Sequence, residues 1–203
     1  MKKILLALTL LPAVIFAQFG PFEEDGVFFE AGMNFTSYNY SDDKGASNNN
    51  IKPGTGVFIR AGLGSIGYKS GFNYGISLNQ FNATGGNGFD LYDWKVTHLG
   101  GFGQWNRFLN KSQTLGFNVA LEISSMISGR QVLGEKSYRL SEYDEFKGIW
   151  FDPRVGINYR AISNESIFIE VGYFSQLGYN LTGGSSESLS FFTHQLGIKL
   201  NIQ

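Results

Sequence analysis

Apolar residues recur at every second position along most of this chain, in runs separated by Gly, Asn, Asp and Ser. An alternation of period two is typical of β-strands, whereas an amphipathic helix repeats about every 3.6 residues. Most of the runs have the roughly 9–11 residues that a tilted strand needs to cross a bilayer. Eight such runs cover about 27–38, 55–64, 72–81, 94–104, 114–124, 149–159, 167–177 and 191–203.

The connections between the runs differ in length in a regular way. Those at 39–54, 82–93 and 125–148 are long, whereas those at 65–71 and 160–166 are short. Outer-membrane barrels have short periplasmic turns and longer external loops. The sequence therefore predicts an all-β fold, an eight-stranded antiparallel up-and-down transmembrane β-barrel with both termini in the periplasm. The longest connection leaves open whether its hairpin extends above the membrane or adds two strands to make ten.

The N-terminus has the features of a secretory signal peptide. Lys2 and Lys3 precede an apolar run over 4–16, which is too short to span a bilayer as a helix. We expect cleavage after Ala17, so that residues 1–17 are the signal peptide and residues 18–203 form the outer-membrane barrel domain.

Composition excludes several classes of protein. Charged residues make up only 16% of the chain, against roughly 25% in an average soluble domain, so fewer side chains than usual face water. A net charge of −1 argues against a strongly basic nucleic-acid-binding protein, and we expect no nucleic-acid partner. The absence of cysteine excludes a disulfide framework, a thiolate metal site and a cysteine nucleophile.

The charged residues inside the runs all fall in the phase opposite to the apolar one, and four of them are acidic and four basic. Such a balanced set suits a closed polar interior, where each ion needs a partner because its desolvation is costly. An eight-stranded barrel leaves no wide aqueous lumen, which favours an interior plug of paired charges over a pore for small ions. The predicted interior charge network consists of Glu30, Arg60, Lys95, Glu122, Asp152, Arg154, Glu170 and Lys199.

The last run ends in a pattern of polar–x–Gly–x–x–apolar–x–apolar, formed by Gln195, Gly197, Leu200 and Ile202. It resembles the assembly signal that the barrel-assembly machinery recognises on the last strand of outer-membrane proteins, although Gln203 stands where many members have an aromatic residue. As a whole, the chain resembles small eight-stranded outer-membrane barrels such as the OmpA transmembrane domain and OmpX. Its sequence pattern is similar to that of the porin-family or PorT-like barrels of the Bacteroidota. This resemblance implies a fold and an outer-membrane location more than an activity.

No motif in the sequence indicates catalysis, cofactor binding or metal binding. The segment 62–67 matches G-x-G-x-x-G, but another alternating run follows it instead of the helix that a dinucleotide site needs. Barrel enzymes that act on lipids show a His-x-Ser pair, which neither His98 nor His194 forms, and His194 falls in the lipid-facing phase. The acidic group at 142–145 lacks the spacing of metal ligands. We therefore predict no catalytic, cofactor-binding or metal-binding residues and no enzymatic activity.

The mixed charges and aromatic residues of the connection 125–148 suit contact with another protein. The predicted function is a structural or protein-interaction role through external loops and the barrel surface. The alternatives are an accessory subunit of an envelope machine such as type IX secretion, which the PorT-like resemblance implies, and a narrow channel or lipid-acting enzyme. The expected partners are outer-membrane lipid, the barrel-assembly machinery during biogenesis, and envelope proteins.

Overall fold

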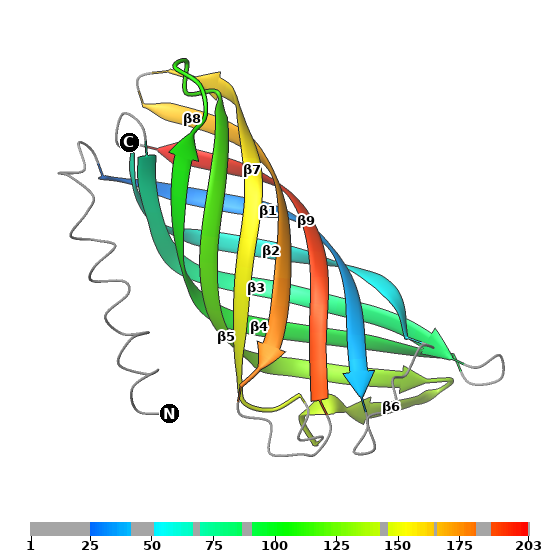
Figure 1. Ribbon diagram of the computed structural model, residues 1–203. Helices are drawn as coiled ribbons and strands as arrows, with labels where there is room; N and C mark the ends of the chain where they lie inside the picture. Colours follow the sequence, from blue (N-terminus) through cyan, green and yellow to red (C-terminus); the bar gives the residue numbers. More distant parts are fainter. Residues whose placement is uncertain are drawn as a thin grey trace.

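The computed structural model describes residues 25–41, 51–66, 70–86, 91–142, 146–164, 166–181 and 188–202. Over these ranges the chain forms one antiparallel sheet that closes on itself as a barrel (Figure 1). The strands are β1 (Asp25–Ser41), β2 (Ile51–Ile66), β3 (Ser70–Gly86), β4 (Leu91–Phe108), β5 (Leu115–Leu133), β6 (Lys136–Arg139), β7 (Ile149–Ser163), β8 (Ile167–Asn180) and β9 (Ser188–Ile202). A short 3₁₀-helix, η1 (Leu140–Glu142), follows β6.

The barrel wall contains eight strands among the described residues, as the alternation predicts. Each strand pairs with its neighbour along the chain, and the β1–β9 pairing closes the ring. The ten-strand alternative is wrong, because among the described residues β6 pairs with β5 alone and over four residues only. The β5–β6 hairpin continues past the end of the wall instead of entering it. The predicted signal peptide at 1–17 lies outside the described residues.

The two ends of the barrel differ. β1 begins beside the last residues of β9, with Val27 opposite Ile202, so the first and last strands start and finish at the same end of the barrel (Figure 1). We call this the terminal end. The opposite end carries the β5–β6 hairpin and η1, and we call it the hairpin end.

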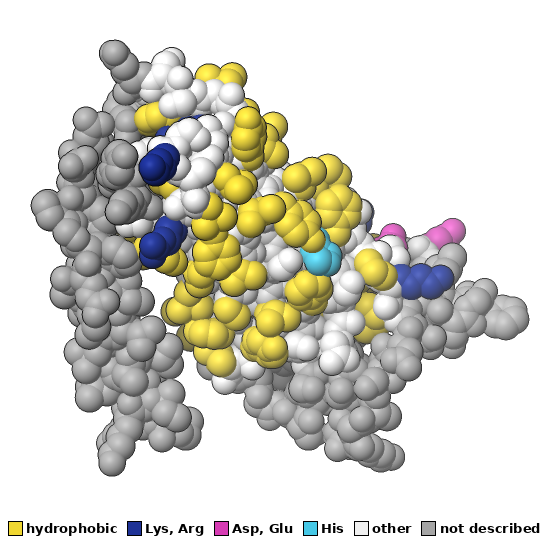
Figure 2. All heavy atoms as spheres, turned by 45° about the horizontal axis from the view of Figure 1, so that its top comes forward, with side chains coloured by type: hydrophobic (Ala, Val, Ile, Leu, Met, Phe, Trp, Pro, Cys, Tyr) yellow, Lys and Arg dark blue, Asp and Glu magenta, His cyan; other side chains and the backbone are white. Residues whose placement is uncertain are grey.

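The outer face of the barrel is apolar. Large hydrophobic side chains point outward, and Ile76 and Ile198 have 65% and 60% of their surface exposed. On one face of the molecule these side chains form a broad field, with the visible charged side chains toward its margins (Figure 2). An exposed apolar surface of this extent suits contact with lipid rather than water. On β1 and β2 the outward set comprises Val27, Phe29, Met33, Phe35, Val57, Ile59 and Leu63.

No helix among the described residues is long and apolar enough to span a membrane.

One run has the opposite phase to the predicted one. On β4, Trp94 and Val96 are buried inside the barrel, and Lys95 between them is exposed on the outer face. The prediction assumed that the apolar phase always faces outward. It is wrong here because the hairpin half of the interior is itself apolar, so that apolar side chains mark the inner face of β4 at this level.

The interior therefore has two chemically distinct parts. Toward the hairpin end it holds a cluster of apolar and aromatic side chains, and toward the terminal end it holds polar and charged side chains. The apolar cluster consists of Tyr38, Phe81, Ala83, Trp94, Val96, Leu140, Phe146, Trp150, Leu189 and Phe191. We call these residues the aromatic cluster.

Candidate functional site

Arg60 lies at the centre of the charged part of the interior and is completely buried. Its Nη1 atom is 3.3 Å from Glu30 Oε2, and its Nε atom is 3.9 Å from Glu122 Oε2. Its Nη2 atom donates a hydrogen bond of 2.7 Å to Gln195 Oε1, and its guanidinium lies 4.2 Å from the ring centre of Phe58. The same Nη2 atom lies 3.5 Å from Asn79 Oδ1, so five strands supply partners for one cation: β1, β2, β3, β5 and β9.

The space for this arrangement comes from a glycine on β9, which is separated from β2 by β1 alone. A Cβ atom added to Gly197 would lie 2.6 Å from Cζ of the Phe58 ring. Any side chain at this position would therefore displace the ring against which the Arg60 guanidinium packs.

Glu122 is held by neutral donors as well as by Arg60. Its Oε1 atom accepts hydrogen bonds from Ser77 Oγ at 2.5 Å and from Asn79 Nδ2 at 2.7 Å. Hydrogen bonds to an ionised group are the stronger kind, and here they come from β3 to β5 across the lumen. They fix the Glu122 carboxylate among the side chains that fill the barrel.

Arg154 and Asp152 point inward from β7 and are buried. Arg154 Nη2 donates to Gln104 Oε1 at 2.6 Å, and its guanidinium lies 5.0 Å from the ring centre of Phe174. Asp152 Oδ2 accepts a hydrogen bond of 2.7 Å from Ser124 Oγ.

A second ionic group lies nearer the terminal end. Arg160 Nη2 is 3.0 Å from Glu170 Oε1, and Lys199 Nζ is 3.8 Å from Glu170 Oε2. The Arg160 guanidinium also packs between two rings, 4.7 Å from the centre of Phe108 and 4.4 Å from that of Phe168. One carboxylate thus lies between two cations, all three of them buried.

The structure brings seven of the eight predicted interior charges inside the barrel and leaves out Lys95, which points outward from β4. It adds Arg160, which falls in the connection predicted at 160–166. Arg160 continues the inward phase of Asp152 and Arg154, and extending that phase by three more pairs of residues along β7 identifies it.

His98 is the other buried residue with chemical potential. It lies inside the aromatic cluster, with its ring centre 5.1 Å from that of Trp150 and 5.2 Å from that of Phe81. Its Nδ1 atom is 3.1 Å from Ser124 Oγ, and the same hydroxyl donates to Asp152.

The order of these groups does not suit a nucleophilic serine. Ser124 Oγ lies between the imidazole of His98 and the carboxylate of Asp152. In a catalytic triad the imidazole instead lies between the serine and the carboxylate. His194, in contrast, lies on the outer face and its Nδ1 atom is 2.6 Å from the hydroxyl of Tyr173.

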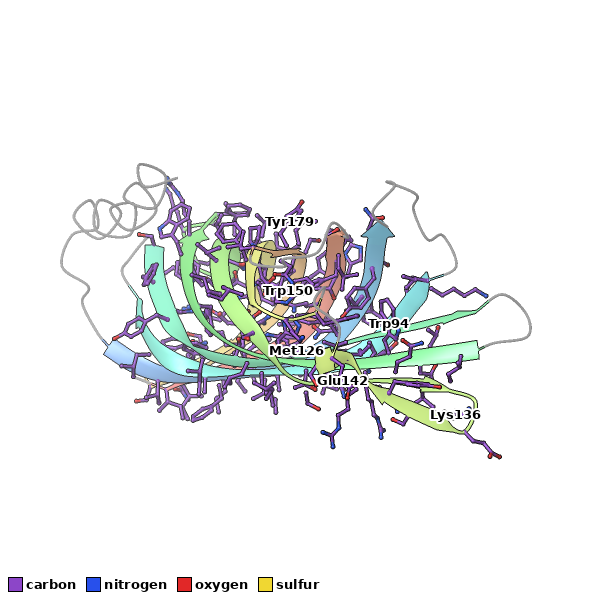
Figure 3. The ribbon with its side chains drawn as sticks, turned by 90° about the horizontal axis from the view of Figure 1, so that it is seen from below. Trp94, Met126, Lys136, Glu142, Trp150 and Tyr179 are labelled. Atoms are coloured by element: carbon purple, nitrogen blue, oxygen red, sulfur yellow. The ribbon has the colours of Figure 1, made fainter. Side chains whose placement is uncertain are left out.

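The hairpin end of the lumen is covered from outside the wall. Leu140 of η1 and Phe146 belong to the aromatic cluster and are 1% and 5% exposed. The ring of Phe146 lies edge-on to Trp94, with 5.2 Å between the centres. Figure 3 looks onto this end and shows Trp150 within the ring of strands.

Little free space remains at the terminal end. A cavity beside Phe28, Asn73 and Asn201 has a volume of about 10 Å³, which is no more than one water molecule needs. Side chains, rather than an aqueous channel, occupy the part of the lumen that the structure describes.

The four residues of the predicted assembly signal lie on β9 in the expected alternation. Gln195 is buried beside Arg60 and Gly197 faces inward, whereas Ile202 points outward. Leu200 also points outward and is half-buried. Their recognition by the barrel-assembly machinery stays a prediction.

Comparison with known proteins identifies the fold. Neisserial surface protein A matches with a TM-score of 0.50 at 12% identity, over 89% of this chain and 99% of that protein. The chain has the fold of small outer-membrane β-barrels. Ail, the attachment invasion locus protein of Yersinia pestis, matches with a TM-score of 0.49 at 11% identity, over 88% and 99%. OprG of Pseudomonas aeruginosa matches with a TM-score of 0.45 at 11% identity, over 88% and 96%. No family model and no curated protein sequence matches the chain.

Proposed function

We propose that this protein is a non-catalytic barrel of the bacterial outer membrane that acts through protein contacts at its hairpin end. The observation that carries the proposal is the contrast between the two parts of the molecule. The lumen is filled with paired charges and aromatic rings, whereas the hairpin projects free of the wall.

The filled interior argues against a role in transport through the barrel. Arg60 spans the lumen from β2 to partners on β1, β5 and β9, and the aromatic cluster closes the hairpin end above it. Such an interior stabilises the barrel as a rigid support. A protein of this kind acts through the elements that project from the barrel.

The β5–β6 hairpin is suited to binding a partner. Every residue of β6 is exposed, including Tyr138. Within the described residues, the second edge of β6 pairs with no other strand. An open strand edge presents backbone N–H and C=O groups, to which a partner can add a strand. Figure 3 shows Lys136 at the tip of the hairpin, pointing away from the barrel.

The proposal includes an orientation. With the termini in the periplasm, the hairpin end faces the outside of the cell, where the partners would be envelope or surface proteins. Export by a signal peptide at 1–17 and insertion by the barrel-assembly machinery through the β9 pattern belong to the same proposal.

A photo-reactive amino acid placed at Tyr138 in living cells tests this function. We expect a discrete cross-linked protein adduct from Tyr138. A matched variant carries the same group at Tyr74, which is 51% exposed on the apolar outer face, and it should give lipid adducts without a discrete protein band. The absence of protein adducts at Tyr138 in a correctly folded barrel would rule out the hairpin as the contact surface.

A further inference from the structure

Three cationic side chains lie side by side on the outer face at the hairpin end. Lys95 of β4 is directly opposite Arg130 of β5, and Arg130 is directly opposite Arg139 of β6. Residues that face each other across neighbouring strands point to the same side of the sheet, and all three side chains are exposed. We call these three residues the cationic row.

No ion pair involves the row in the part of the chain that the structure describes. Neighbouring Cβ atoms in such a row lie about 4.5–5.5 Å apart, and like charges directly opposite each other destabilise a sheet. Asp93 lies on the same face of β4 as Lys95, Glu135 lies in the hairpin turn and Glu142 in η1, and none of these described carboxylates forms an ion pair with the row. Repulsion between the three cations destabilises the free protein, and a bound anion would relieve it.

A hollow beside the row offers room for such an anion. β5 pairs with β7 as far as Ser125 and meets β6 only at Arg130, so among the described residues no strand pairs with the segment between these two residues on that side. Figure 3 shows Met126 of β5 and Glu142 of η1 near the base of the hairpin. The hollow has a volume of about 370 Å³, and its lining consists of Met126, Ile127, Ser128, Gly129, Arg130, Ser137, Arg139 and Ser141.

The lining has the chemistry of a phosphate site. Two guanidinium groups offer the paired N–H donors that bind phosphate oxygens in a bidentate manner. Three serine hydroxyls, from Ser128, Ser137 and Ser141, add neutral donors around the same hollow. A carboxylate or phosphate group would meet several donors at once.

The position of the cationic row along the barrel axis indicates which kind of molecule carries the phosphate. Ile127 is 57% exposed and Leu99 is 48% exposed, and both belong to the apolar outer face next to the row. Lys95 is four residues beyond Leu99, which is about 13 Å along the strand. Cations directly above a lipid-facing surface lie at the level of the lipid headgroups.

We propose that Lys95, Arg130 and Arg139 bind a phosphate-bearing headgroup of a membrane lipid in the leaflet at the hairpin end, with the headgroup in the adjoining hollow. This lipid site goes beyond the protein contacts proposed above. It uses the outer face of the hairpin base, whereas the protein contacts use its projecting edge.

Retention of a defined lipid by the purified, folded full-length barrel tests the proposal. The probes are lipid A with both phosphates and the same lipid after dephosphorylation, and bound lipid is counted by native mass spectrometry. We expect the wild-type barrel to retain the phosphorylated lipid at least about tenfold better. Equal retention of the two lipids would overturn the proposal, and this comparison needs no variant.

Two double variants then locate the site. Arg130→Gln with Arg139→Gln should lower retention of the phosphorylated lipid by about tenfold or more. Lys52→Gln with Lys136→Gln removes two exposed cations at the same end outside the row and should leave retention unchanged. Equal losses in the two double variants would mean general electrostatic attraction and contradict a built site.

Millimolar inorganic phosphate separates the lipid from a soluble anion. A lipid site gains affinity from the acyl chains on the apolar face, so free phosphate should displace little of the bound lipid. Complete displacement would assign the row to a soluble phosphate and overturn the lipid assignment.

Discussion

At the scale of single residues, the interior is most sensitive at Arg60, because two carboxylates depend on it. Replacing Arg60 by Leu leaves Glu30 and Glu122 buried without their cation. Removal of one partner of a buried ion pair costs about 3–5 kcal/mol. We expect this loss in the free energy of unfolding, measured by urea titration of the barrel in phospholipid vesicles with tryptophan fluorescence.

The matched control is Arg107→Leu, which removes an exposed arginine on β4 and should change stability by less than about 0.5 kcal/mol. Adding Glu30→Gln and Glu122→Gln to Arg60→Leu should recover part of the lost stability, because the unpaired charges are then gone. No recovery in the triple variant would show that lost packing against Phe58, rather than lost charge pairing, causes the effect.

A second prediction at this scale concerns how deep in the bilayer a residue of the outer face lies. Ile59 lies halfway along β2, is 54% exposed, and has apolar neighbours Ala31 and Leu78 on the flanking strands. Arginine at the centre of the bilayer costs about 2–4 kcal/mol, and near the interface about 0–1 kcal/mol. Ile59→Arg should therefore destabilise the barrel in vesicles by the larger amount, and Thr55→Arg on the same face of β2 by the smaller. Equal costs in the unfolding titrations would contradict a lipid-facing outer surface.

Residue-level prediction from the sequence works where alternation and polarity agree. Glu30, Arg60 and Glu122 lie inside because each alternates with apolar residues that face outward. Lys95 is the exception, since its apolar neighbours on β4 face an apolar interior instead of lipid. Periodicity separates the two faces of a strand, but it does not say which face is inside when both surroundings are apolar.

At the scale of the elements, the hairpin depends on its turn. Gly134 has a φ of 58°, and the two residues between β5 and β6 are Gly134 and Glu135. Because a Cβ added to Gly134 would meet nothing within 4 Å, the cost of a substitution is backbone strain alone. A β-branched residue in this region costs about 1–2 kcal/mol. Gly134→Val should speed hydrogen exchange of the Lys136 and Tyr138 amides, which face β5, severalfold while the unfolding midpoint of the barrel stays the same.

Gly134→Asn is the control for the hairpin, because asparagine tolerates a positive φ better than other non-glycine residues. It should leave the exchange of β6 close to wild type. A drop in the unfolding midpoint in Gly134→Val would mean that the hairpin supports the wall, against its description as a projecting element.

The eight wall strands are confirmed as predicted, but their lengths are not. The connection predicted at 82–93 is mostly strand, because β3 continues to Gly86 and β4 starts at Leu91. The alternation fades in these segments since, beyond the apolar belt, neither face needs to be apolar. The sequence therefore marks the part of each strand that meets lipid, and backbone pairing carries the strand further.

At the scale of the whole molecule, two separate barriers close the lumen. Leu140 and Phe146 cover the hairpin end, and the layer around Arg60 and Arg154 fills the middle. The first is apolar and comes from a connection, whereas the second is ionic and comes from the wall itself. Each would stop ions by a different means, by exclusion of water or by occupation of the lumen with fixed charge.

This double closure predicts the electrical behaviour of the barrel in planar bilayers. The wild-type protein should show conductance at the level of the lipid alone. Leu140→Ala with Phe146→Ala removes the apolar cover, yet conductance should stay at that level because Arg60, Glu122 and Arg154 still occupy the lumen. Adding Arg60→Ala and Arg154→Ala should open a path and give discrete steps. Conductance steps in the wild-type protein would contradict a filled lumen and assign the barrel to the narrow channels. Conductance steps after the first double substitution would mean that the apolar cover is the sole barrier.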